Sequence, residues 1–78
     1  MKKEEFLRLL QEALEFQGVE LRETTVLKGI EGYDSMSVMS VIAFVDEHFS
    51  KRLTAKQLAE ITTVRTLMEL VGDENFSD

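Results

Sequence analysis

The chain has 78 residues, 44% of them hydrophobic, which suffices for one small core, so we expect a single domain over residues 1–78. The net charge of −6 excludes a nucleic-acid binder, because such proteins need a basic surface to displace phosphate counterions. Cysteine is absent, which excludes a disulfide framework, a thiolate metal site and a thiol nucleophile belonging to the chain itself.

The first predicted helix covers residues 2–17. Acidic residues in its opening turn suit the helix dipole, and Gly18 is expected to end it. Its apolar side chains recur at helical spacing and form one stripe, which consists of Phe6, Leu9, Leu10, Ala13 and Leu14.

Residues 18–34 are predicted to form a long loop. A structureless loop of this length is uncommon in a small domain, so we expect it to be held down by its own apolar side chains, Leu21, Leu27 and Ile30, with one short helical turn. A short strand at residues 24–28 would find no partner nearby.

A second helix is predicted over residues 35–50, and its apolar stripe consists of Val38, Val41, Ile42, Val45 and Phe49. The opposite side is semi-apolar, since it carries Met36 and Ala43 with Phe44 at its border. Phe44 either packs under a neighbouring element or belongs to a contact patch.

Two shorter helices complete the chain. The capping-box pattern of Thr54 and Gln57 predicts a helix over residues 55–60, and Thr62 or Thr63 caps another over residues 64–71. The tail, residues 73–78, is expected to fray, although Phe76 could dock. The predicted fold is therefore all-α, a four-helix bundle of three longer helices and one short one, with a long loop between the first two.

The residues offer little for catalysis. His48 is the single histidine, and it lies thirteen residues from Ser35 on one helix, about 20 Å away at 1.5 Å per residue. The carboxylates match no metal-ligand spacing, so no metal site is expected. We therefore predict that the chain is not an enzyme.

The apolar runs are far too short to span a bilayer, and no signal-peptide core follows the basic start of the chain. We expect a monomeric, soluble protein of the cytoplasm, with no membrane insertion. Its acidity favours basic partner surfaces.

Ser35 stands where the polar loop gives way to the most apolar helical stretch. A serine at such a boundary is either the N-cap of the helix or a modification site beside the acid Asp34.

The arrangement of these elements resembles an acyl carrier protein. Asp34-Ser35-Met36 is similar to the family's Asp-Ser-Leu attachment motif, with Gly32 two residues ahead of the acid, and the stretch Ile61–Val64 opens the last helix as in that family. The likeness runs from about Phe6 to Val71.

The resemblance implies that Ser35 receives 4′-phosphopantetheine from coenzyme A by a separate transferase, and that Asp34 helps that transferase to recognise the site. The thiol of the arm would carry acyl intermediates as thioesters. A chain without cysteine has no thiol of its own, so it needs a cofactor for this chemistry. The implied setting is fatty-acid, polyketide or related specialised lipid metabolism. The implied partners are the phosphopantetheinyl transferase, acyl-transferring or acyl-activating enzymes, and synthases.

Carriers of the fatty-acid type place acids soon after the serine, where this chain has Ser37 and Ser40. We therefore expect a specialised carrier with dedicated partners and a largely apolar partner face, which consists of Met36, Met39, Ala43, Phe44 and Glu47.

An acyl pocket inside the bundle is expected to be lined by Val41, Val45, Leu58 and Ile61. Two alternatives stay open. One is an aminoacyl carrier of the D-alanyl or peptidyl type, the latter weakened because only one glycine of Gly-Gly-x-Ser is present. The other is an unmodified adaptor that docks through Met36 and Phe44.

Overall fold

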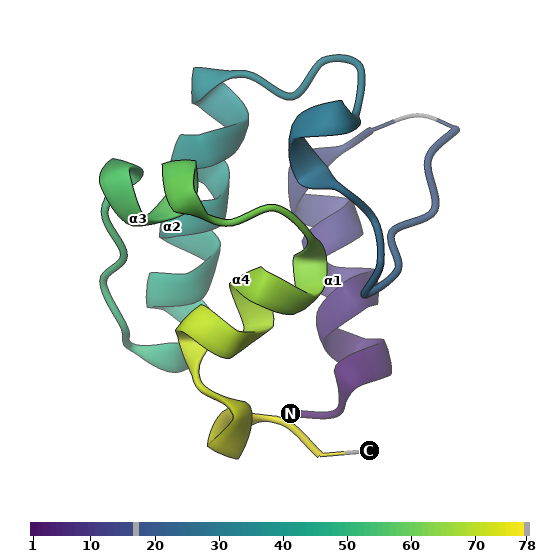
Figure 1. Cartoon of the computed structure of the whole chain (residues 1–78). Coiled ribbons are helices and arrows are strands. Elements are labelled where there is room, and N and C mark those ends of the chain that lie inside the picture. The colour runs from purple at the N-terminus through teal and green to yellow at the C-terminus, as the bar shows by residue number, and fades with distance from the viewer. Residues whose placement is uncertain (17, 78) are drawn as a thin grey trace.

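Four α-helices and two short 3₁₀ turns make up the computed structural model, which describes residues 1–16 and 18–77 (Figure 1). No strand occurs among these residues, so the predicted all-α fold is confirmed. The helices are α1 (Lys3–Leu14), α2 (Ser35–Phe49), α3 (Ala55–Glu60) and α4 (Val64–Val71), and the turns are η1 (Leu27–Gly29) and η2 (Asp73–Asn75). The predicted ranges of α3 and α4 are confirmed, and α2 is one residue shorter than predicted.

The predicted range of the first helix, residues 2–17, is wrong at both ends. α1 stops at Leu14 because Glu15 adopts the left-handed conformation, with φ 54°, and its N–H donates to the Gln11 carbonyl at 3.0 Å. The Gln11 side chain then accepts from the Leu21 N–H at 2.9 Å, which fastens the following loop to the helix. The predicted stop at Gly18 therefore comes too late, and residue 17 lies outside the described residues.

The long loop is ordered by burial and by backbone pairing. Leu21 and Leu27 are buried, Ile30 packs against the core, and the predicted helical turn is η1. Val26 forms an antiparallel bridge with Thr63, so the expectation that this stretch has no partner is wrong. The backbone bonds run to the start of α4: Leu27 N to Thr62 O at 3.0 Å, Val64 N to Thr25 O at 3.0 Å, and Arg65 N to Glu23 O at 2.9 Å.

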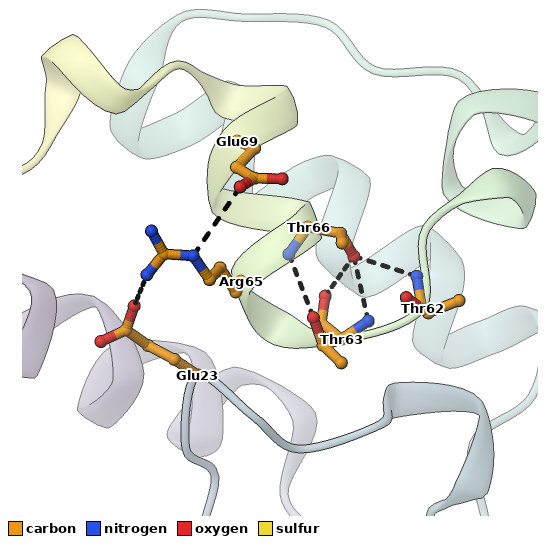
Figure 2. Close-up of polar contacts among 6 residues, drawn as sticks. All are labelled: Glu23, Thr62, Thr63, Arg65, Thr66 and Glu69. Atoms are coloured by element: carbon orange, nitrogen blue, oxygen red, sulfur yellow. Dashed lines mark hydrogen bonds and ion pairs between the residues drawn. The ribbon is translucent and has the colours of Figure 1, made fainter.

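Side chains reinforce this junction (Figure 2). Thr63 caps α4, since its hydroxyl accepts from the Thr66 N–H at 3.3 Å and the Thr66 hydroxyl accepts from the Thr63 N–H at 3.0 Å. Arg65 reaches across to Glu23 of the loop at 3.0 Å and back to Glu69 at 3.7 Å. The start of α4 is therefore both a helix cap and the anchor of the loop.

Phe6 lies at the centre of the core. Its ring meets those of Phe44, Phe49 and Phe76 at centroid distances of 5.6, 6.0 and 5.0 Å. Phe44 is only 4% exposed, so it packs under a neighbouring helix and does not belong to a contact patch. The other buried apolar residues are Leu10, Leu14, Leu21, Leu27, Val41, Val45, Leu53, Leu58, Ile61, Val64, Leu67, Met68 and Val71.

The tail docks where fraying was expected, so that prediction is wrong for residues 73–77, while residue 78 lies outside the described residues. Phe76 packs against the core, and the Ser77 backbone exchanges hydrogen bonds with Met1 O at 2.9 Å and Lys3 N at 3.0 Å. The two ends therefore lie close together (Figure 1). Within residues 1–16 and 18–77, no helix is long and apolar enough to cross a membrane.

Candidate functional site

The N-terminal end of α2 is built by Asp34 and Ser37. The Asp34 Oδ1 accepts from the Ser37 N–H at 3.1 Å, and the Ser37 hydroxyl accepts from the Asp34 N–H at 3.3 Å. This is a reciprocal capping box, with serine in place of the usual acid or amide at its third position. Asp34 is therefore the N-cap, and the interpretation of Ser35 as the cap is wrong.

Ser35 is the first residue of α2 and is exposed. No hydrogen bond engages its side chain within the part of the chain that the structure describes, because the capping is done by its neighbours on either side. Gly32, with φ 94°, turns the chain into this end of the helix in a conformation that favours glycine. The result is a free hydroxyl on a rigid helix tip, a position open to an enzyme that modifies it.

An apolar groove of about 390 Å³ opens beside Ser35, between α2 and α3. Its volume falls in the range of small-molecule sites, roughly 300–1,000 Å³. Lys28 borders it from the loop, and its ammonium donates to the Ala59 carbonyl, which ties η1 to α3. The remaining lining residues are Tyr33, Val38, Met39, Ile42, Ala55, Leu58 and Ala59.

Tyr33 is a site residue that the sequence analysis missed. Its hydroxyl is buried and has no hydrogen-bond partner within the described residues. Burial raises the pKa of this phenol above its usual 10.0, so the group stays protonated at neutral pH. Its ring faces Phe16 at a centroid distance of 6.4 Å. Its position two residues before Ser35 is the sequence feature that could have identified it. A tyrosine suits the edge of an apolar groove, because its ring is apolar and its hydroxyl is polar.

The predicted acyl-pocket residues divide between the groove and the core. Leu58 lines the groove, whereas Val41 and Val45 are fully buried and Ile61 is nearly so. The structure brings only Leu58 of these four to the groove at Ser35. The apolar spacing in the sequence could not distinguish residues that line the groove from residues of the core, because both positions need apolar side chains.

Of the five residues of the predicted partner face, four are exposed and Phe44 is buried. Met36 and Met39 are 75% and 69% exposed, and Ala43 and Glu47 are also exposed. Phe44 lies in the core instead, where its ring also meets that of His48 at 4.5 Å. Ser37 is only 9% exposed and its hydroxyl belongs to the helix cap. The serine at this position is therefore explained by capping, and it does not stand in for an acid on the surface.

The sequence model of one family, described as phosphopantetheine attachment site, matches residues 4–71, which run from α1 to the end of α4. Comparisons with curated proteins and with solved structures returned no significant match.

Proposed function

This chain belongs to the phosphopantetheine attachment site family, and on that premise we propose that Ser35 bears the 4′-phosphopantetheine arm and that the arm carries an acyl group. Membership makes the chain a carrier with a covalent cofactor and not itself a catalyst. It also implies work with a phosphopantetheinyl transferase and with the enzymes of a pathway. The cofactor supplies the thiol that this cysteine-free chain lacks.

The choice of Ser35 rests on its environment. The hydroxyl is exposed, engaged by nothing else in the described chain, and next to an apolar groove that can receive a flexible group attached to it. Asp34 adjoins it, with one carboxylate oxygen used by the cap. We propose that the exposed carboxylate of Asp34 also meets the transferase during loading.

The observation that carries the choice of an acyl cargo is the apolar lining of the groove. Val38, Met39 and Ile42 face Leu58 and two alanines across it. Aliphatic chains are stabilised there by about 0.8 kcal/mol per buried methylene. A charged ammonium, as on an alanyl cargo, would lose its water at a lining that holds no carboxylate to pair with it. We therefore propose fatty-acid, polyketide or related specialised lipid metabolism and not aminoacyl transfer.

Attachment is tested by incubating the protein with coenzyme A, magnesium and a broad-specificity phosphopantetheinyl transferase, followed by intact-mass measurement. The wild type and Ser40→Ala, a control on the same helix, should gain one phosphopantetheine, and Ser35→Ala should gain none. No gain in the wild type, under conditions that load another carrier, would mean an unmodified adaptor.

The cargo is tested by comparing the melting temperatures of octanoyl-loaded and alanyl-loaded protein. Octanoyl should raise Tm well above the alanyl form, since 1 kcal/mol shifts Tm by about 4–8 °C in a domain of this size. Ala59→Leu narrows the groove and should reduce the octanoyl gain while leaving the alanyl form unchanged. Equal gains from both cargoes would contradict the acyl assignment.

We also propose that partners dock on the face formed by Met36, Met39, Ala43 and Glu47. Two exposed methionines favour short-range packing over long-range steering, which fits a specialised carrier with dedicated partners. Acylation by a generic fatty-acid transacylase should be slow and only weakly dependent on salt. A rate and a salt dependence equal to those of an acid-rich carrier would contradict this proposal.

A further inference from the structure

The buried hydroxyl of Tyr33 has no partner within the described residues, although nearly all buried polar side-chain atoms in folded proteins have one. We propose that this hydroxyl is a positioning group of the groove, which donates a hydrogen bond to a carbonyl oxygen of the bound arm or of its cargo. The inference rests on the proposed attachment at Ser35. The hydrogen bond from Tyr33 would add one polar, selective contact to a groove whose lining is mostly apolar.

The placement of Tyr33 supports this role. It lines the same groove as Ser35 and stands two residues before it, at the point where the loop enters α2. Of the other polar residues of the lining, Lys28 is engaged by the Ala59 carbonyl and Ser35 is the proposed attachment point. The Tyr33 side chain thus lines the groove, and its hydroxyl has no hydrogen-bond partner within the part of the chain that the structure describes.

The chemistry of the two sides is complementary. A neutral phenol both donates and accepts hydrogen bonds, and an amide or thioester carbonyl can only accept. Two chemically similar sources can supply that carbonyl: the amides of the arm, and the acyl group joined to its thiol. A hydrocarbon segment at this position would leave the hydroxyl unpaired, so the contact would fix how far along the groove the carbonyl lies.

Tyr33 could also have a purely structural role, because its ring packs against that of Phe16. In that case removal of the hydroxyl alone would not change the effect of loading. Tyr33→Phe keeps the ring and removes only the hydroxyl. In the unloaded protein this variant should be as stable as the wild type or more so, since a buried unpaired group is removed. In the loaded protein the wild type should gain more in Tm on loading than the variant does. Equal gains would overturn the inference.

A second readout does not depend on stability. Tyr33 is the single tyrosine and tryptophan is absent, so the near-ultraviolet phenolate absorbance reports this one group. Its pKa is measured in the apo protein, the protein with the free arm, and the protein with an amide-linked octanoyl analogue that survives high pH. Circular dichroism confirms that the fold persists over the titration.

Donation from the neutral phenol should raise its pKa on loading, because ionisation would break the bond. A rise with the free arm assigns the carbonyl to an amide of the arm, and a rise only with the octanoyl analogue assigns it to the cargo. An unchanged or lower pKa in fully loaded protein, verified by mass, overturns the inference and leaves attachment at Ser35 intact. Failure to load at all overturns the proposed function together with this inference.

Discussion

Asp34 and Ser37 hold each other across the first turn of α2, through bonds of 3.1 and 3.3 Å, and leave Ser35 between them unengaged. Asp34 and Ser37 cap the helix, and Ser35 keeps its hydroxyl free, so the two roles belong to different residues. A residue that caps a helix has its side-chain oxygen occupied, whereas an attachment site needs that oxygen free.

Ser37→Ala removes one half of this box. We expect the free energy of unfolding to fall by about 1 kcal/mol, and Tm by about 4–8 °C, because the Asp34 N–H loses its acceptor. Ser40→Ala is the control, since no hydrogen bond engages its side chain within residues 1–16 and 18–77. Thermal denaturation of both variants measures the difference, and equal Tm values would mean that the serine is not part of the cap.

Asp34→Asn separates capping from recognition. Asparagine caps helices about as well as aspartate, so the free energy of unfolding should change little. The rate of phosphopantetheine loading should fall, because the negative charge next to Ser35 is lost. Intact-mass time courses give the rate. An unchanged rate would remove Asp34 from the proposed recognition of the transferase.

Phe76→Ala should destabilise the whole domain and not the tail alone, since its ring packs on Phe6 and Phe49 at 5.0 and 5.4 Å. We expect a loss of about 1–3 kcal/mol in the free energy of unfolding. Ser77→Ala is the control, because the hydrogen bonds of Ser77 to Met1 and Lys3 use its backbone. Chemical denaturation of the two variants measures the loss, and a frayed tail would give wild-type values for both.

The loop and α4 offer a comparison between an ion pair and apolar burial. Arg65→Met removes the exposed contacts to Glu23 and Glu69 and should cost under about 1 kcal/mol, less still at high salt. Leu27→Ala should cost about 2–5 kcal/mol, because Leu27 is fully buried. Denaturation at low and high salt tests both values, and a larger loss from Arg65→Met would assign the anchoring to charge.

Tyr33 also predicts a dependence of stability on pH. Burial raises its pKa in the folded protein above the unfolded value of 10.0, so its contribution is complete below pH 10. That contribution is lost as the pH rises through the folded pKa, because the unfolded chain ionises first. The wild type should therefore lose more stability above pH 10 than Tyr33→Phe, which lacks this phenol. Parallel stability curves would contradict the shift.

Local signals predicted the later helices well. Thr54 with Gln57 is a capping box that needs no other part of the chain, and Gly72 ends α4 as expected. The end of α1 could not be found in this way, since Glu15 takes a left-handed conformation that few residues other than glycine adopt.

The remaining differences depend on distant contacts. The sequence left Phe44 open between burial and a contact patch, and its burial depends on Phe6, which lies opposite it. Residues 24–28 were expected to lack a partner, and the partner of Val26 is the distant Thr63. At the site, the motif around Ser35 predicted an attachment position, and this stays a prediction. It did not show that Asp34 is the cap, because that depends on backbone angles, nor that Tyr33 has an unpaired hydroxyl.

The backbone bonds between the loop and the start of α4 have a consequence for local opening. They join residues far apart in sequence, so the loop and this helix end should unfold and refold as one cooperative unit. Amide hydrogen exchange at Leu27, Val64 and Arg65 would then proceed at one common opening rate, although Leu27 belongs to a loop. The same loop leads directly into Asp34 and Ser35, so a disturbance at the start of α4 reaches the N-terminal end of α2 along the chain itself.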